Sequence, residues 1–243
     1  MLKLLNSDKI LERATTGYLA LPAAKQKQLK ESLDNGKALL ESESQMNAYL
    51  HHYGEMHRQK LFRAFAGLPM AMFNGNLSVI DWGCGQGLAS IVLDEYLERE
   101  KSLSDVITDI CLIEPSKTCL RRAVGNITWT LPHALLSSIN KKEESVLPDD
   151  LCVQEDTILH IMSNVVDMPD FSGAGIRNYL SSENKYRHVI VIVSPFYPEE
   201  GRGKRMDEFS NSLEGFHTVF SFQKHIDEWK ENYSCQIRIL DNF

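Results

Sequence analysis

Residues 79–88 read VIDWGCGQGL: a short apolar run ends in an acid, and three glycines follow at alternate positions. The run is typical of a buried strand, and from Leu88 to Arg99 the apolar spacing is that of a helix. Glycine is needed where the backbone takes positive φ, or where a ligand lies against the main chain without an intervening Cβ. The free N–H groups of a helix start favour a carboxylate or a phosphate. These residues therefore predict a strand, a glycine turn and a helix that form a ligand site.

The chain after residue 76 repeats this alternation of strand and helix. The predicted strands are 77–81, 107–114, 156–162, 188–194, 218–223 and 234–240, and the predicted helices are 88–99, 116–124, 172–182 and 204–213. Residues 127–131 are a candidate for a further strand. Apolar strands separated by helices are typical of a doubly wound, mostly parallel sheet that is covered on both faces. We expect residues 76–243 to form this α/β domain.

Residues 1–75 have a different character, because apolar residues recur at helical spacing among Lys, Gln and Glu. We interpret them as an N-terminal helical extension. One predicted helix, over about 41–67, puts Tyr49, Tyr53, His57 and Leu61 on one face. Two interpretations fit that face. It packs in a core, or it docks over the ligand site as a lid and lends Tyr53 and His57 to the bound ligand.

Two classes of ligand use a glycine turn of this kind, and the residues here separate them. A dinucleotide site has the pattern G-x-G-x-x-G, and neither register fits, since its third position falls on Leu88 or Ser90. Asp81 would also repel a bound diphosphate in a crevice of low dielectric constant. A ligand that carries positive charge would instead be attracted to Asp81. The turn therefore favours a cationic ligand over a nicotinamide dinucleotide.

The residues Asp81, Gly83, Gly85 and Gly87 resemble the first motif of the class I S-adenosylmethionine-dependent methyltransferases, D/E-x-G-x-G-x-G, and match it at every defined position. S-adenosylmethionine carries an ammonium and a sulfonium, so it is a ligand of the required charge. The resemblance implies that it is the cofactor and that Asp81, Gly83, Cys84, Gly85 and Gly87 bind it. The resemblance also implies the seven-stranded sheet of this superfamily, and it says nothing about the acceptor of the methyl group.

Glu114 ends the second predicted strand, which Pro115 stops. Its carboxylate is therefore expected at the carboxyl edge of the sheet, where open α/β sheets bind their ligands. In the superfamily that the chain resembles, an acid at this place accepts hydrogen bonds from both ribose hydroxyls, which implies that Glu114 binds the cofactor. The alternative is a strand-end glutamate that faces solvent.

Polar residues at the end of the fourth strand are the candidates for catalysis. Methyl transfer needs alignment of the two reactants, and it needs a base only where the nucleophile arrives protonated. Ser163 and Asn164 are placed to face cofactor and acceptor, so both are catalytic candidates, and Ser163 is also a candidate cofactor ligand. A turn role is the alternative for Asn164. His160, inside the strand, is predicted to be a core histidine.

The next strand is followed by Ser194-Pro195-Phe196-Tyr197, which is close to the D/N/S-P-P-Y/F/W tetrapeptide of methyltransferases that act on base amines. The third position is Phe where that motif has Pro, and the strand is predicted to be the fifth rather than the fourth. We therefore prefer a substrate-facing loop, in which Tyr197, Arg202 and Arg205 bind the acceptor, the arginines through a phosphate or carboxylate. The alternative is a charged turn without a binding role.

Composition restricts the partners. The chain has 243 residues, 43% of them hydrophobic and 24% charged, and a formal net charge of −7. This charge leaves nucleic acid binding possible through local patches but does not support it. The longest apolar run is far below the roughly 20 residues of a membrane-spanning helix, and we expect a cytoplasmic protein without a membrane partner. The five cysteines show no paired spacing, so neither disulfides nor a metal site are expected.

Two main hypotheses follow. The first is an S-adenosylmethionine-dependent methyltransferase whose acceptor, an RNA, a protein or a small molecule, the sequence does not identify. The second is a methyltransferase-fold protein that acts as an interaction or regulatory subunit without catalysis. A nucleobase amino-methyltransferase and a nicotinamide oxidoreductase fit fewer of the residues. The sequence does not indicate the oligomeric state.

Overall fold

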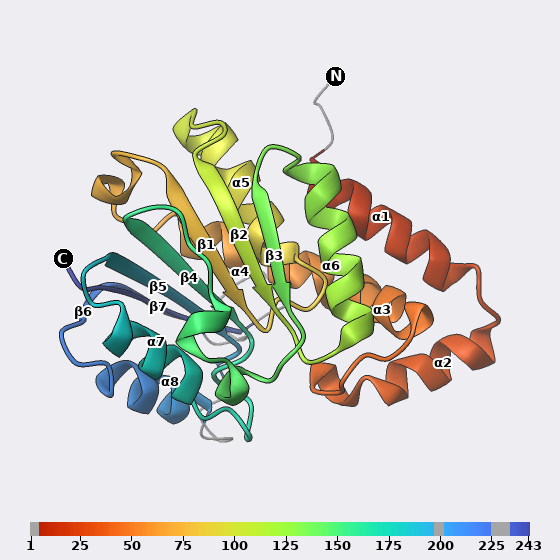
Figure 1. The fold of residues 1–243 in the computed structure, drawn as a ribbon. Coiled ribbons are helices and arrows are strands. Elements are labelled where there is room, and N and C mark those ends of the chain that lie inside the picture. The colour runs from red at the N-terminus through yellow and green to blue at the C-terminus, as the bar shows by residue number, and fades with distance from the viewer. Residues whose placement is uncertain (1–4, 197–201, 225–233) are drawn as a thin grey trace.

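The computed structural model describes residues 5–196, 202–224 and 234–243. Its centre is one seven-stranded sheet in the order β3-β2-β1-β4-β5-β7-β6 (Figure 1). The strands are β1 Leu77–Trp82, β2 Ile107–Ile113, β3 Leu135–Ile139, β4 Thr157–Ser163, β5 Arg187–Ser194, β6 His217–Lys224 and β7 Cys235–Asp241. Strands β1 to β5 pair in parallel, and β7 runs antiparallel to β5 and β6. The predicted doubly wound, mostly parallel seven-stranded sheet is confirmed.

Helices cover both faces of the sheet. They are α4 Glu55–Phe65, α5 Leu88–Lys101, α6 Lys117–Thr130, α7 Ala174–Ser182 and α8 Arg202–Asn211. Side chains alternate along a strand, so Val79 belongs to the core under α4, α5 and α6, whereas Ile80 belongs to the core under α7 and α8. Figure 1 shows α7 and α8 in front of the sheet and α5 behind it. Burial of both faces explains why the central strands are apolar throughout.

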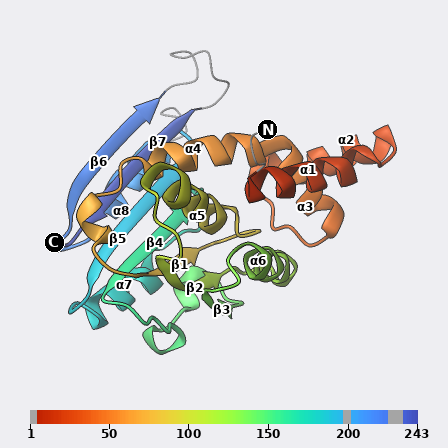
Figure 2. The ribbon, with the colours of Figure 1, turned by 90° about the horizontal axis from the view of Figure 1, so that it is seen from above.

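The N-terminal residues form the helices α1 Asn6–Leu19, α2 Ala23–Ser32 and α3 Glu43–Tyr49, and then α4. One π-helical turn, Leu50–Gly54, joins α3 to α4, so the helix predicted over 41–67 is present with a bulge near its middle. Bulges of this kind are frequent at functional sites. Helix α4 packs against α5 and the sheet, whereas α1, α2 and α3 lie beyond it, on the side of α6 (Figure 2).

The candidate strand at 127–131 is wrong, because these residues are the end of α6 and the position after it. Leu120, Ala123 and Ile127 recur at three- and four-residue steps and are all buried, which is a helical pattern. The third strand is instead β3, at an edge of the sheet, where Leu135 is exposed. A half-exposed edge strand lacks the apolar run by which the other strands are recognised.

The carboxyl ends of β1, β2 and β4 meet at one edge of the sheet, because the three strands are adjacent and parallel. Trp82, the last residue of β1, pairs with Ile113 of β2 and with Met162 of β4. The residues that come directly after these pairs are candidate ligand-binding residues from three separate parts of the sequence. The topology therefore gathers them in one place.

Candidate functional site

The glycine turn joins β1 to α5. Gly83, Gly85 and Gly87 have φ of 66°, 53° and 79°, in the left-handed region that favours glycine. A Cβ on Gly83 would lie 2.5 Å from a methyl carbon of Val165, whereas a Cβ on Gly85 would meet no described atom within 4 Å. Gly83 is thus required by packing, while Gly85 leaves bare backbone next to open space. The predicted turn is confirmed.

Glu114 follows β2 and holds the glycine turn from the neighbouring strand. Its Oε2 accepts the backbone N–H of Gly85 at 3.0 Å, and its Oε1 accepts that of Ser116 at 2.9 Å. The side chain is buried. Burial raises the pKa of its carboxyl, and the two backbone donors oppose that rise. Each carboxylate oxygen has a second lone pair, so Glu114 can accept further hydrogen bonds from a ligand.

Asp81 is the acid near the end of β1, and it is 1% exposed. Its Oδ2 accepts the hydroxyl of Ser90 at 2.8 Å. Burial raises the pKa of Asp81 to about 7; the hydrogen bonds from Ser90 lower it by less, and the charge of Glu114 adds to the rise. A nearby cation would favour the ionised carboxylate. The charge of Asp81 is therefore poised to respond to a cationic ligand.

Asn164 follows β4 and is held in the left-handed region, with φ of 58°. Its Nδ2 donates to Ser163 Oγ at 3.0 Å and to His57 Nδ1 at 2.9 Å. Both donors of the amide are thus used, while its Oδ1 is buried and has no hydrogen-bond partner among the described residues. A buried acceptor without a partner is destabilising by about 1–3 kcal/mol. Beside a cavity, it marks a place for a donor from a ligand.

His57, on α4, reaches the end of β4 from the N-terminal helices. Because Asn164 donates to its Nδ1, the proton of the neutral imidazole is on Nε2, which donates to the hydroxyl of Tyr49 at 3.3 Å. The rings of Tyr49 and His57 stack with their centres 5.7 Å apart. Burial, followed by the charge of Lys60, lowers the pKa of His57 to about 3. The ring is therefore neutral, and both of its nitrogens are engaged.

Polar contacts fix the N-terminal helices over the glycine turn. Gln86, within the turn, donates from Nε2 to the carbonyl of Met46 at 3.2 Å. Arg122 of α6 donates to Gln86 Oε1 at 3.0 Å and to Asn47 Oδ1 at 2.9 Å, and it forms an ion pair with Glu43. The helices of the extension are thereby tied to the turn itself. The same helix face also packs in the core through Leu61, so the two interpretations of the sequence are not exclusive. Contact of Tyr53 and His57 with a cofactor stays a prediction.

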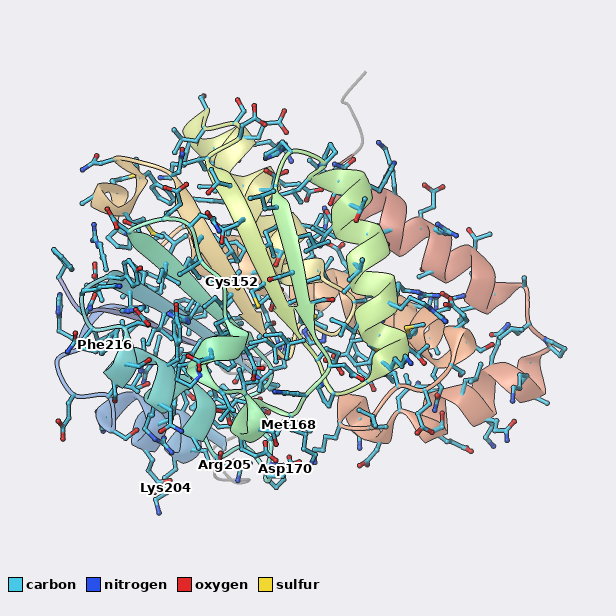
Figure 3. The ribbon with its side chains drawn as sticks, in the orientation of Figure 1. Cys152, Met168, Asp170, Lys204, Arg205 and Phe216 are labelled. Atoms are coloured by element: carbon cyan, nitrogen blue, oxygen red, sulfur yellow. The ribbon has the colours of Figure 1, made fainter. Side chains whose placement is uncertain are left out.

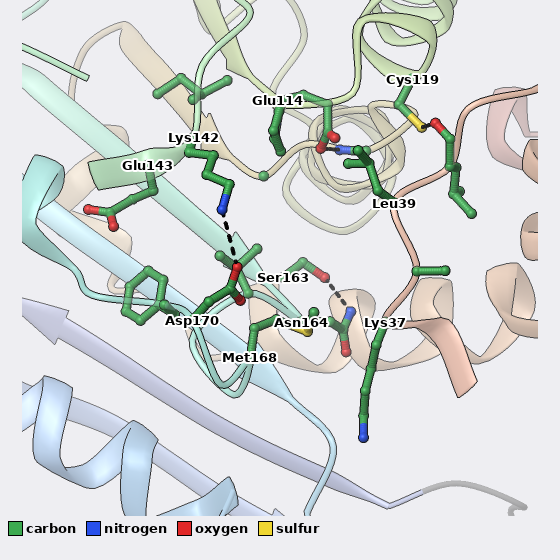
Figure 4. A pocket seen from close by; sticks show the side chains of 18 of the residues that line it. Lys37, Leu39, Glu114, Cys119, Lys142, Glu143, Ser163, Asn164, Met168 and Asp170 are labelled. Carbon is green, nitrogen blue, oxygen red and sulfur yellow. Dashed lines mark hydrogen bonds and ion pairs between the residues drawn. The ribbon is translucent and has the colours of Figure 1, made fainter. Parts of the chain in front are cut away.

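A cavity of about 440 Å³ opens between the glycine turn, the end of β4 and the segment that precedes α3 (Figure 4). This volume is in the usual range for small-molecule sites. The candidate residues on its wall are Gly83, Gly85, Glu114, Ser163 and Asn164. A smaller chamber, of about 80 Å³, shares several of these residues and extends to Asp81 and His57. Glu114 lines the larger chamber and Asp81 lines the smaller one, so each chamber has one of these two acids beside the glycine turn.

The outer part of the cavity is lined by side chains that the sequence analysis does not assign. Lys37 and Lys142 reach it from different segments, and Figure 4 shows Lys142 directed at Asp170, with 3.6 Å between the charged atoms. Met168 and Phe171 add apolar surface. These residues belong to loops that only the tertiary fold brings together. The outer part is therefore both charged and apolar.

Most of the predicted cofactor residues lie at the two chambers. Those that line one or both are Asp81, Gly83, Cys84, Gly85, Glu114, Ser163 and His57. Gly87 instead caps the start of α5. Tyr53 is set back from the described lining, and its ring makes an edge-to-face contact with that of Tyr49, with the ring centres 5.3 Å apart. Tyr49 lines both chambers, and its place on the same helix face as His57 is the sequence signal for it.

The residues predicted to bind the acceptor are placed differently. The guanidinium of Arg205 donates to the carbonyl of Asp167 at 3.0 and 2.7 Å, which fastens α8 to the loop after β4. Figure 3 labels Arg205 together with Met168 and Asp170 of this loop. Arg205 is not among the described residues that line the cavity. Tyr197 and the side chain of Arg202 lie outside the described residues. Contact of these three residues with an acceptor stays a prediction.

His160 is a core residue, as predicted. The indole N–H of Trp82 donates to its Nδ1 at 3.2 Å, and its Nε2 donates to His188 Nδ1 at 3.0 Å. His188 in turn donates from Nε2 to the carbonyl of Glu183 at 2.8 Å. This series of donors fixes one neutral tautomer for each ring, and burial lowers the pKa of both. His160 supports the sheet and does not border the cavity described above.

All five cysteines are unpaired, and four of them are buried. Within the described ranges, no cluster of three or more His, Cys, Asp or Glu side chains is arranged to hold a metal ion. None of the helices in these ranges combines the length and the apolar character needed to cross a membrane.

Comparison with known proteins supports the fold. No family model matches the chain, and no curated protein matches it. A SAM-dependent methyltransferase from Leishmania major has a similar structure over 95% of this chain and 90% of its own, with a TM-score of 0.50 and 13% identity. A magnesium protoporphyrin IX methyltransferase from Synechocystis PCC 6803, solved with bound SAM, is similar over 100% of both chains, with a TM-score of 0.49 and 12% identity. The chain has the fold of the class I methyltransferases, as its glycine motif predicts.

Proposed function

We propose that this protein is an S-adenosylmethionine-dependent methyltransferase. One observation carries the proposal: the bare backbone of Gly85, the buried acid Asp81 and the strand-end acid Glu114 surround the same pair of chambers. They lie at the carboxyl edge of the sheet, where open α/β sheets bind ligands. The similar protein from Leishmania major is a SAM-dependent methyltransferase with the same fold.

The chemistry of these residues fits S-adenosylmethionine. Gly85 leaves open space where any other residue would place a Cβ. Glu114 keeps a free lone pair on each oxygen, which suits the two hydroxyls of a ribose. Asp81 supplies negative charge in a buried chamber, which suits a cation and disfavours a diphosphate.

The protein has mainly to align the reactants. When bound, S-adenosylmethionine supplies a methyl group on a sulfonium, which is already an activated leaving group. Asn164 Oδ1, a buried acceptor without a described partner, would accept a hydrogen bond from an N–H or O–H group of the ligand or the acceptor. Ser163 and His57 hold the two donors of that amide, so its orientation is fixed in advance. We assign His57 as a positioning residue for Asn164.

A cofactor-binding protein without turnover is the second candidate, and one feature of the site favours it. Both nitrogens of His57 and both oxygens of Glu114 are hydrogen-bonded within the protein. The free lone pairs of Glu114 are assigned to the ribose hydroxyls, so neither group is assigned as a base toward a protonated nucleophile. If the protein turns over, its acceptor atom is one that needs no such base, for example a neutral amine or a thiolate.

Calorimetry with S-adenosylmethionine, S-adenosylhomocysteine and NAD⁺ tests the proposal. We expect both sulfur nucleosides to bind and NAD⁺ not to bind. A screen with radiolabelled methyl donor over RNA, protein and small-molecule fractions then separates the two candidates. Incorporation supports the methyltransferase, and binding without incorporation in any fraction supports the non-catalytic protein. Absence of S-adenosylmethionine binding, or binding of NAD⁺ instead, would overturn both.

A further inference from the structure

A second cavity, of about 560 Å³, lies between α1 and α6. It shares no lining residue with the 440 Å³ cavity beside the glycine turn. Figure 1 shows the two helices side by side at the edge of the molecule, with α6 between α1 and the sheet. The proposed methyl transfer uses none of this groove, so its residues need an explanation of their own.

The groove is formed by two stripes of side chains at helical spacing. Lys9 and Arg13 are four residues apart on α1, and Arg121, Gly125 and Trp129 are four residues apart on α6. Residues at this spacing share one face of a helix. Helix α1 therefore presents two cations to the cavity, and the stripe on α6 begins with Arg121 and ends in an aromatic ring.

Positive charge is concentrated in this groove although the chain carries a net charge of −7. Four of the lining residues are Lys or Arg, and the one carboxylate among the described lining residues, Glu43, is paired with Arg122. Arg13 and Arg121 are exposed and make no ion pair within the described part of the chain. Two guanidinium groups of this kind are suited to bind phosphate through paired hydrogen bonds.

Trp129 gives the groove a flat aromatic surface, and Gly125 leaves open space beside that surface. The indole is 55% exposed, and Lys9 Nζ lies 5.4 Å from the centre of its ring. Gly125 is in a helix interior, where glycine is less favourable than alanine. A Cβ there would meet no described atom within 4 Å, so packing does not require the glycine. Gly125 therefore leaves the floor of the cavity free of a side chain, one helical turn from the indole of Trp129.

We propose that the groove between α1 and α6 binds single-stranded nucleic acid. Arg13 and Arg121 contact the phosphates, and a base stacks on Trp129. A single strand is favoured over a duplex, because its bases are free to leave their neighbours and stack on the ring. An acidic peptide would satisfy the two arginines but has no planar base for the indole. The inference does not depend on the proposed methyl transfer.

Fluorescence anisotropy with a fluorescein-labelled uridine dodecamer tests the proposal. The wild-type protein is expected to bind it with a Kd of about 1–100 µM at moderate salt, and more weakly as salt rises. The double variant Arg13→Glu/Arg121→Glu is expected to raise the Kd at least about tenfold. The matched control Lys25→Glu/Lys27→Glu makes the same charge change on the exposed side of α2 and is expected to stay within about twofold.

Two variants that leave the charge unchanged test the stacking surface. Trp129→Ala removes the ring, and Gly125→Leu fills the floor of the cavity with a better helix former. Each is expected to raise the Kd about tenfold without lowering the unfolding midpoint. A thymidine dodecamer compares DNA with RNA at the same groove. Retained S-adenosylmethionine binding in these variants keeps the result separate from the proposed function.

Three outcomes would overturn the proposal. The first is that the wild-type protein does not bind the dodecamer. The second is that the arginine and tryptophan variants bind it as tightly as the wild-type protein does. The third is that polyglutamate of equal charge displaces the labelled dodecamer as efficiently as unlabelled uridine dodecamer does. The last result would assign the groove to an acidic peptide.

Discussion

The carboxylate of Glu114 accepts the backbone N–H of Gly85 at 3.0 Å, so the end of β2 holds the turn that follows β1. The same carboxylate accepts the N–H of Ser116, where α6 begins. Glu114 and Gly85, which lie 29 residues apart in the sequence, are thus joined by a hydrogen bond in the structure. Glu114 orders the turn and still offers lone pairs to the cavity, so a ligand bound there would meet it directly as well as through the backbone of Gly85.

Replacing this acid should weaken ligand binding. We expect Glu114→Gln to raise the Kd for S-adenosylhomocysteine about tenfold or more, since a hydrogen bond to a charged group contributes roughly 1.5–3 kcal/mol. The amide can accept from only one of the two backbone donors and turns an N–H toward the other. Calorimetry measures the change. Glu98→Gln, on the exposed side of α5, is the control, and equal affinities for the two variants would contradict the role of Glu114.

The turn itself is tested by a valine at Gly85. Valine is strained at φ of 53°, and its side chain would occupy the space that the ligand needs. We expect Gly85→Val to abolish binding of S-adenosylmethionine and to keep cooperative thermal unfolding. Gly75→Val is the control, because a Cβ at that position also meets no described atom within 4 Å, and its φ is not positive. Unchanged affinity in Gly85→Val would refute the assignment of the site.

Asp81 predicts a dependence of binding on pH. Its raised pKa of about 7 means that the carboxyl of the free protein is largely protonated below pH 7, and a cationic ligand binds only after the proton leaves. The affinity for S-adenosylmethionine should therefore rise with pH, by up to about tenfold per pH unit below the pKa. Calorimetry from pH about 5.5 to about 7.5 measures the slope.

The variant Asp81→Asn supplies the comparison for that slope. It has no carboxyl to titrate, so its affinity should be lower than that of the wild-type protein at neutral pH and should change little with pH. A slope in the variant as steep as in the wild-type protein would show that another group titrates.

The buried histidine pair predicts a loss of stability in acid. Burial lowers the pKa of His160 and His188, so below pH of about 6.5 the unfolded chain binds protons that the folded chain does not. The free energy of unfolding is therefore highest above that pH. It falls as the pH drops, by up to about 1.4 kcal/mol per pH unit for each histidine.

Urea unfolding of His160→Gln measures this contribution. The variant should be less stable than the wild-type protein at neutral pH, because the flexible amide does not hold an acceptor for Trp82 and a donor for His188 at the fixed positions of the two ring nitrogens. The difference should narrow toward pH 5, since the variant has one ring fewer to protonate. His217→Gln, an exposed position of β6, should leave the pH dependence unchanged. A difference that widens in acid would contradict the account.

The glycine turn could be predicted from sequence because its requirements are local. Positive φ at alternate positions can be met by glycine within the segment itself. Glu114 could be predicted because it ends the next strand, and adjacent parallel strands end at one edge of a sheet. The edge strand β3 was missed for the opposite reason, since two of its five residues are exposed, none is fully buried, and it has no apolar run.

The contacts from the N-terminal helices could not be placed from sequence. The helical face of Tyr49 and His57 is visible as a pattern, but its partner Asn164 lies 107 residues from His57 along the chain. The groove between α1 and α6 could not be placed either, because each helix contributes only part of the positive charge of the groove. The net charge of the chain conceals such a local concentration.

A crystal structure with S-adenosylhomocysteine tests the central claim most directly. The account predicts density for the nucleoside over the backbone of Gly85, with ribose hydroxyls within hydrogen-bonding distance of the Glu114 carboxylate. Density at another place in the molecule, or a Gly85 region closed by protein side chains, would contradict it.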